Sequence, residues 1–207
     1  MENNYNHLKS LFKYLVTQIP LNNSNRAEFL LFWDEYLSLK YKYTDEHKFF
    51  QQVFLFKCSI HGGNVQMNIN VSGCLDNLEV LPIITRQFTC EDFIYNQTRK
   101  NFLSAVNKLI HTRYIGQYPI MAIKMPNSAD KKYIVVEGNH RISTAVFENR
   151  PIDVLCFETF LLPPNMFLSI RNWLSYIMIA SFYQILNFDS PSVCFQDIGT
   201  FLDQYTA

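Results

Sequence analysis

Apolar residues recur at helical spacing near the start of the chain. Between Asn6 and Ile19 they follow a repeat of three and four residues, and Pro20 with the Asn-rich run behind it ends the pattern, which predicts a first helix. The same spacing returns between Arg26 and Tyr43, with Asn25 as the expected N-cap, and predicts a second helix. Because the connection is short, we expect these two helices to form a hairpin.

Two runs typical of strands come next. Val53 to Ile60 and Val65 to Val71 flank the segment His61-Gly-Gly-Asn64. Adjacent glycines accept the positive φ angles of a tight turn, so this pattern predicts a β-hairpin.

The last part of the chain is helical in pattern. After Pro163 and Pro164 the spacing predicts a long helix from Asn165 to about Leu186, and a short last helix after Pro191. The most apolar stretch, Trp173 to Leu186, is shorter than the roughly 20 residues that span a bilayer, and it includes three polar side chains. We therefore expect a buried or partner-facing helix and no membrane partner.

A strand that turns directly into a helix is the most informative local pattern. The β-branched run Ile134 to Val136 predicts a central strand that ends at Glu137, and Gly138 permits a sharp turn. Helical spacing runs from about His140 to Glu148, with Asn149 as the expected stop. Backbone N–H groups at a helix start carry partial positive charge, so the junction is a candidate anion site.

The side chains at this junction have mixed chemistry. Arg141 offers a planar fork that matches phosphate oxygens, His140 can exchange a proton near neutral pH, and Glu137 can order a cation, a hydroxyl or the histidine. Ser143 and Thr144 would contact a phosphate oxygen or a metal-bound water, or else satisfy helix carbonyls. The alternative for the whole motif is an ordinary turn in which Arg141 pairs with Glu137 and His140 hydrogen-bonds to the backbone.

Composition limits the classes of function. With 207 residues, 48% of them hydrophobic and 15% aromatic, the chain is expected to form one packed domain. Its 18 basic and 18 acidic residues cancel, which gives no electrostatic reason for tight nonspecific binding to nucleic acid. The five cysteines form no Cys-x-x-Cys pair, and the N-terminus has no secretory pattern. We therefore expect reduced thiols and a cytoplasmic protein.

The sequence Glu-Gly-Asn-His-Arg at 137–141, with its flanks, resembles the signature turn of the ParB/sulfiredoxin superfamily. The resemblance covers Leu78 to Glu158. It implies an α+β fold with a mixed-sheet core over 78–158. The patterns described above add two helices and a hairpin over 1–72 and helices over 161–207 to this core, and the resemblance does not extend to them. The core elements that it implies are a strand from Leu78 to Ile84, a helix from Arg99 to Ile110, a lead into the next strand at Gly116 to Ile120, and a closing strand within Asn149 to Phe157.

The resemblance also implies a ligand and site residues. Members of the superfamily hold nucleotide phosphates at the glycine turn, and its branches use them for CTP-dependent DNA clamping, sulfinic acid repair or phosphorylation of free serine. Asn139 stands where sulfiredoxins have a nucleophilic cysteine, which argues against that branch. Glu137, the acidic residue before the glycine, is similar to the acidic residue of the free-serine kinase branch and of the Asp-Gly-Gln-His-Arg proteins of DNA modification systems. Further implied residues are Arg99, facing the anion, and Glu91, beside Asp92, as a base; a solvated arginine and a helix-start acid are the alternatives.

Three hypotheses follow. The first is a nucleotide-dependent phosphotransferase that uses ATP, ADP or CTP with Mg²⁺ and acts on a small hydroxyl-bearing substrate. In it the phosphates are held by Gly138, Asn139, His140, Arg141, Ser143, Thr144 and Arg99, with Glu137, His140 and Glu91 as catalytic groups and no protein-built metal cluster. The second is a noncatalytic nucleotide-sensing or DNA-associated regulatory module, and the third is a nuclease. The flanking helices would cover the core, bind a protein partner or form a homodimer, and a DNA partner is not favoured.

Overall fold

The computed structural model describes residues 6–18, 23–42, 53–60, 63–88, 119–127, 133–187 and 191–207. Helices and strands are both present, which confirms the predicted α+β class. In chain order the elements are α1 Asn6–Gln18, α2 Asn23–Tyr36, β1 Val53–Ile60, β2 Gly63–Asn70, α3 Val71–Asp76, β3 Ile83–Phe88, β4 Met121–Lys124, β5 Tyr133–Glu137, α6 Asn139–Phe147, β6 Ile152–Phe157, the 3₁₀ turn η1 Pro164–Met166, α7 Ile170–Asn187 and α8 Pro191–Asp203.

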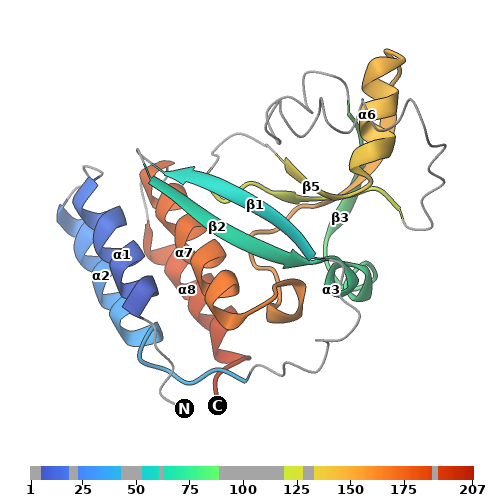
Figure 1. Cartoon of the computed structure of the whole chain (residues 1–207). Coiled ribbons are helices and arrows are strands. Elements are labelled where there is room, and N and C mark those ends of the chain that lie inside the picture. Colours follow the sequence, from blue (N-terminus) through green and yellow to red (C-terminus); the bar gives the residue numbers. More distant parts are fainter. Residues whose placement is uncertain are drawn as a thin grey trace.

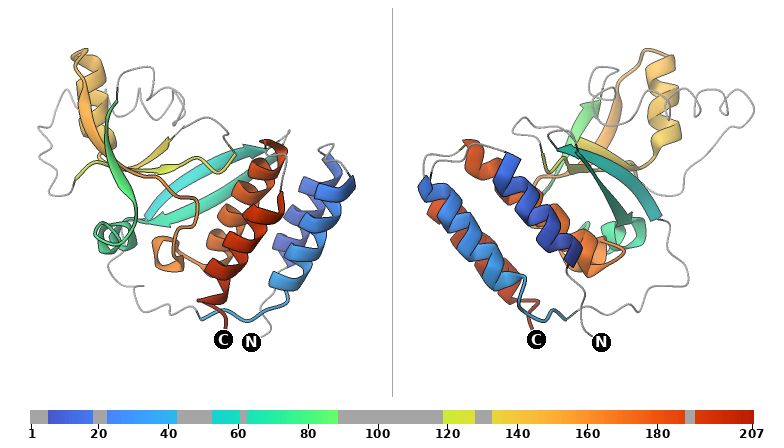
Figure 2. Two further views of the ribbon diagram at one scale, coloured as in Figure 1. Left: turned by 180° about the vertical axis from the view of Figure 1, so that it is seen from behind. Right: turned by 60° about the vertical axis from the view of Figure 1, so that its left-hand side comes forward.

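The helices from the two ends of the chain pack together. Figure 1 shows α1, α2, α7 and α8 on one side of the molecule, α6 on the far side, and the β1–β2 hairpin between them; the two views of Figure 2 agree. α7 is the centre of this bundle, since it contacts α1, α2, α8 and β2. Its residues 173–182 are all buried, as the sequence predicts.

Aromatic rings fill the bundle. The ring of Phe29 lies 5.7 Å from that of Phe12 and 5.3 Å from that of Phe182. The buried indole N–H of Trp33 donates to the Ser181 hydroxyl at 3.1 Å, so this polar group keeps a partner inside the apolar core. In the described part of the chain no helix has the length and apolarity that crossing a membrane requires.

The predicted hairpin is confirmed. β1 and β2 are antiparallel, and Ile60 pairs with Gly63, so β2 begins at Gly63 and includes Gly63 and Asn64, which the sequence pattern assigns to the turn. One face of the hairpin turns Phe56, Cys58 and Ile60 into the main core. The hairpin is thereby fixed against the bundle.

The second sheet has four described strands in the order β3-β6-β4-β5, with β4 and β6 parallel and the other pairs antiparallel. Among the described strands β5 stands at one end of this order, so the predicted central position of the strand Ile134 to Val136 stays a prediction. Its residues are nevertheless all buried. Ile134 and Val136 face the main core, while Tyr133 and Val135 face a smaller core with Ile142 of α6. The apolar run reflects burial on both faces and not the number of strand neighbours.

The strand predicted from Leu78 to Ile84 is misplaced, because the strand of this region is β3, Ile83–Phe88, and a helix, α3, precedes it. α3 begins at Val71, which the sequence pattern assigns to the end of the second hairpin strand. The Asn77 side chain donates to the Gly73 carbonyl at 2.7 Å and to the Asn165 side-chain oxygen at 3.1 Å, so a contact distant in sequence stabilises this helix end. Pro82 has no backbone N–H to donate to a neighbouring strand, so the strand begins only after it, at Ile83.

The predicted second helix ends seven residues early. After Tyr36 the chain leaves α2, the N–H of Lys42 donates to the Tyr205 carbonyl at 2.7 Å, and the N–H of Ala207 donates to the Lys40 carbonyl at 2.8 Å. Pairing with the last residues of the chain therefore replaces the final helical turns.

The helix predicted from Asn165 is also interrupted. Phe167 forms a bridge with Ile69, and the Leu168 N–H donates to the Asn68 carbonyl at 3.1 Å, so this short segment continues the hairpin. α7 starts only at Ile170. The predicted helix Arg99 to Ile110 and the segment Gly116 to Tyr118 lie outside the described residues, whereas Pro119 and Ile120 lead directly into β4.

Candidate functional site

The β5–α6 junction has the strand-turn-helix geometry that the sequence predicts. Gly138 has a φ of +91°, and a Cβ atom built on it would lie 2.6 Å from Ile120 Cγ1 and 3.1 Å from Arg141 Nη2. Both the backbone angle and the space therefore require glycine here. α6 begins at Asn139, and its first helical hydrogen bond runs from the Ile142 N–H to the Gly138 carbonyl at 3.0 Å. The N–H groups of residues 139–141 precede this bond at the helix start.

The far end of this helix is also as predicted. Asn149 adopts a φ of +50°, and the Arg150 N–H donates to the Ala145 carbonyl at 2.9 Å. A left-handed residue directly after a helix ends it, and asparagine tolerates that conformation better than most residues. The prediction of Asn149 as the stop is confirmed, and β6 follows within the predicted closing segment.

A pocket of about 180 Å³ opens at the junction, and we call it the β5–α6 pocket. Five of its residues are predicted site residues, which the structure thus brings together, and three others complete the lining. The lining residues are Glu137, Gly138, Asn139, His140 and Arg141, together with Val53, Phe54 and Val136. Val53 and Phe54 come from the start of β1 and were not predicted as part of the site, since no local pattern links them to a motif over 80 residues away.

Glu137 and Arg141 form an ion pair across one helical turn. Oε1 of Glu137 lies 3.7 Å from Nη2 of Arg141, and the two side chains are 10% and 24% exposed. This pairing is part of the alternative that the sequence left open. At 3.7 Å the contact is longer than a hydrogen bond, and the Nε and Nη2 atoms of Arg141 are buried with no hydrogen-bond partner in the described part of the chain. These two atoms are donors that a further acceptor could use once the pair with Glu137 opens.

The hydroxyls that follow the turn donate to backbone. Ser143 is fully buried and donates to the Asn139 carbonyl at 2.8 Å, and Thr144 donates to the His140 carbonyl at 3.0 Å. Neither side chain lines the pocket. Both thus take the alternative given above, in which they satisfy helix carbonyls. Glu91 and Arg99 lie outside the described residues.

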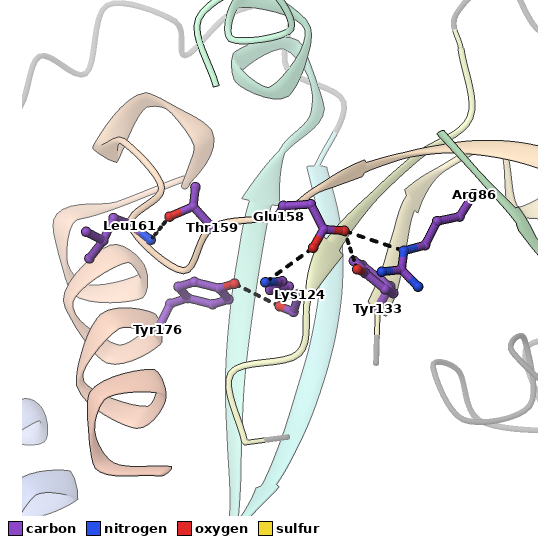
Figure 3. A network of polar contacts seen from close by, with 7 residues as sticks. All are labelled: Arg86, Lys124, Tyr133, Glu158, Thr159, Leu161 and Tyr176. Atoms are coloured by element: carbon purple, nitrogen blue, oxygen red, sulfur yellow. Dashed lines mark hydrogen bonds and ion pairs between the residues drawn. The ribbon is translucent and has the colours of Figure 1, made fainter. Parts of the chain in front are cut away.

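A second polar cluster lies at the opposite end of β5, around the carboxylate of Glu158 (Figure 3). The Tyr133 hydroxyl donates to Oε1 of Glu158, Nζ of Lys124 lies 3.4 Å from Oε2, and Nε of Arg86 lies 3.5 Å from Oε1. The Arg86 guanidinium also lies over the Tyr133 ring, 5.1 Å from its centre. These four residues belong to or directly follow four different strands, so no spacing of residues along the sequence predicts that they form a cluster.

The pKa shifts in this cluster follow from burial and charge. Burial raises the pKa of Tyr133, and the hydrogen bond to the Glu158 carboxylate raises it further. Burial alone would raise the pKa of Glu158, but the hydrogen bond from Tyr133 and the charges of Lys124 and Arg86 outweigh it and lower that pKa. The cluster thus holds an ionised carboxylate whose contacts connect the strands. Figure 3 also shows a contact between this sheet and α7, in which the Tyr176 hydroxyl donates to the Lys124 carbonyl at 2.8 Å.

Other candidate chemistry is limited within the described ranges. There, no group of three or more His, Cys, Asp or Glu side chains is arranged to hold a metal ion. Cys58, Cys74 and Cys156 are buried thiols outside any disulfide, as predicted, and burial raises the pKa of Cys58 to about 12. These thiols are placed as core residues and not as nucleophiles.

Comparison of the chain with protein-family models, with curated proteins and with solved structures gives no significant match. Its function must therefore be inferred from the residues and contacts of the β5–α6 pocket.

Proposed function

We propose that the chain binds the phosphates of a nucleotide, together with Mg²⁺, in the β5–α6 pocket and transfers a phosphoryl group to a small hydroxyl acceptor. The observation that carries this proposal is the Arg141 guanidinium, which has buried donors without hydrogen-bond partners in the described chain and lies directly over Gly138 at the start of α6. A phosphate there would receive hydrogen bonds from the guanidinium and from the backbone of the helix start. The resemblance to the ParB/sulfiredoxin signature supports the same ligand.

The pocket size indicates which part of a nucleotide it would hold. Sites for ligands of drug size are about 300–1,000 Å³, whereas this pocket has about 180 Å³. It is large enough for phosphate groups, and the apolar side chains of Val53 and Phe54 would lie beside the part of the nucleotide to which the phosphates are attached. The sugar and base would extend beyond the described walls.

Phosphoryl transfer depends mainly on positioning and on neutralising negative charge. Arg141 and the helix start would do this for the phosphates. Glu137 lies in the same pocket, so its carboxylate can hold Mg²⁺ and orient an acceptor hydroxyl once a phosphate has taken over Arg141. The other base that the sequence predicts, Glu91, lies outside the described residues.

The test is nucleotide binding by wild type and two arginine variants. ATP, ADP, CTP and GTP with Mg²⁺ are each titrated while the melting temperature is followed. A ligand at about 100 times its Kd stabilises the folded state by about 2.7 kcal/mol, which is about 5–10 °C for a chain of this size. We expect such a shift with at least one nucleotide, and its loss in Arg141→Ala.

Arg150→Ala is the matched control. Arg150 lies just beyond the other end of α6, is half exposed and pairs with Glu148, so removing it changes the net charge equally without touching the pocket. It should bind nucleotide like wild type. If no nucleotide shifts the melting temperature of wild type, or if the shift persists in Arg141→Ala, the proposal is wrong. Where binding is found, ³¹P NMR with serine, glycerol and similar hydroxyl compounds then tests for transfer.

One observation favours a noncatalytic nucleotide-sensing module as the second candidate. In the structure the Glu137 carboxylate pairs with Arg141, and the hydroxyls of Ser143 and Thr144 donate to backbone carbonyls. The pocket is also bounded by β1, whose hairpin partner β2 contacts α7 of the bundle. A ligand would then signal from the sheet to the bundle. This candidate predicts saturable binding without product, and a change in oligomeric state or partner binding measured by light scattering.

A further inference from the structure

We infer that the β5–α6 pocket binds its anion more tightly together with a divalent cation, because the carboxylate of Glu137 weakens the binding of an anion that arrives alone. This inference rests on the proposed function, since it concerns how phosphate enters the same site. Its basis is the charge of the pocket and the burial of Glu137.

The charges of Glu137 and Arg141 in the pocket cancel. Glu137 and Arg141 are its only carboxylate and guanidinium among the described residues, and they pair with each other. The start of α6 adds about half a positive charge. The net attraction for a phosphate carrying two or more negative charges is therefore small as long as Glu137 keeps its charge.

The position of Glu137 makes this repulsion direct. Its side chain is only 10% exposed, so solvent screens its carboxylate poorly. An anion bound to Nη2 of Arg141 would lie within a few ångströms of the carboxylate, because Oε1 of Glu137 is 3.7 Å from that nitrogen. Like charges at such spacing near a protein surface weaken binding by about tenfold or more.

A divalent cation reverses the role of Glu137. Mg²⁺ in phosphate sites is commonly held by one or two carboxylates and by oxygens of the phosphates. Glu137 fits that requirement, since it is a single buried carboxylate next to the anion donors. The binding step is then an exchange of partners: Arg141 passes from Glu137 to the phosphate, and Glu137 passes from Arg141 to the cation. By reciprocity each ligand raises the affinity for the other, and Mg²⁺ alone should bind weakly.

The experiment is calorimetric titration with inorganic pyrophosphate, in Mg²⁺ and in EDTA. Wild type should bind pyrophosphate at least about tenfold more tightly in Mg²⁺ than in EDTA. Glu137→Gln keeps the shape of the side chain and removes its charge. This variant should bind pyrophosphate in EDTA about tenfold more tightly than wild type does, and Mg²⁺ should add little further affinity.

Two further variants serve as controls. Glu148→Gln removes a half-exposed carboxylate at the other end of α6 and should behave like wild type. Glu137→Asp keeps the negative charge one methylene further back and should still bind pyrophosphate more tightly in Mg²⁺ than in EDTA. It also provides the test if circular dichroism shows that Glu137→Gln is unfolded, because a Glu137→Asp protein that binds equally in EDTA and Mg²⁺ would overturn the inference.

The outcomes separate this inference from the proposed function. Equal binding by wild type in EDTA and Mg²⁺, or an undiminished Mg²⁺ effect in Glu137→Gln, overturns the role of Glu137 and leaves the phosphate site intact. Absence of pyrophosphate and nucleotide binding in both conditions overturns both. The expected pattern, tighter binding of pyrophosphate by wild type in Mg²⁺ than in EDTA and loss of that difference in Glu137→Gln, supports both.

Discussion

Replacing Glu158 by Gln should destabilise the protein through the cluster that joins four strands. The Gln carbonyl can still accept the Tyr133 hydroxyl, so the substitution removes mainly the charge. A hydrogen bond to a charged group contributes about 1.5–3 kcal/mol and a part-exposed ion pair at most about 1 kcal/mol. Glu158 receives the Tyr133 hydrogen bond and pairs with Lys124 and Arg86 at 3.4 and 3.5 Å, with its own side chain 20% exposed. We expect a loss of about 2 kcal/mol, since these terms overlap, and a melting temperature about 4–8 °C lower.

The dependence on pH makes this prediction specific. The pKa of Glu158 in the folded protein is lowered from its ordinary value of 4.5. Its stabilisation is therefore complete above about pH 4.5 and is lost as the pH falls further, through the folded-state pKa. In urea unfolding the difference between wild type and Glu158→Gln should be full at pH 7 and shrink at pH 3.

Glu148→Gln is the reference for this measurement, because Glu148 is half exposed and pairs with Arg150 alone among the described residues. It should change the free energy of unfolding by less than about 0.5 kcal/mol. A Glu158→Gln effect equal to that of Glu148→Gln, or one that is unchanged at pH 3, would refute the role given to the cluster.

Three further predictions concern buried groups. Gly138→Ala should lower the free energy of unfolding by about 3 kcal/mol, because alanine is strained at the positive φ and its Cβ meets Ile120; an unchanged urea midpoint would contradict this. Cys58, whose pKa burial raises to about 12, should react with a thiol reagent at pH 8 only as the protein unfolds, and rapid labelling of the folded protein would disprove its burial. Burial, with the hydrogen bond to Asp203, raises the pKa of Tyr36 from 10 to about 12. Tyr36→Phe should thus cost about 1 kcal/mol near pH 8, and the difference from wild type should shrink as the pH rises from 10 toward 12; a pH-independent difference would count against the hydrogen bond.

Local patterns predicted the junction well. The strand at Tyr133–Glu137, the turn at Gly138, the helix and its end at Asn149 are all encoded by neighbouring residues, and so is the hairpin of β1 and β2. Their physical causes, β-branched runs, glycine freedom and helical spacing, act within a few residues.

Features that depend on distant residues were missed. β3 has the polar sequence Thr85-Arg86-Gln87 in its middle, which does not predict a strand. It is a strand because it pairs with β6. α3 is stabilised by the Asn165 contacts, and Phe54 reaches the pocket only through the placement of the hairpin. Pairings of this kind are set by tertiary structure, which overrides local propensity.

The bundle of α1, α2, α7 and α8 has a consequence for synthesis on the ribosome. About 130 residues separate the end of α2 from the start of α7, and translation at about 5–20 residues per second takes on the order of ten seconds to cover them. During that time the apolar faces of α1 and α2 lack the helix that buries them. The emerging chain thus exposes an apolar surface that can aggregate unless a chaperone binds it. Slow codons between Tyr36 and Ile170 should increase aggregation, whereas slow codons before Asn6, at which neither α1 nor α2 has been made, should not.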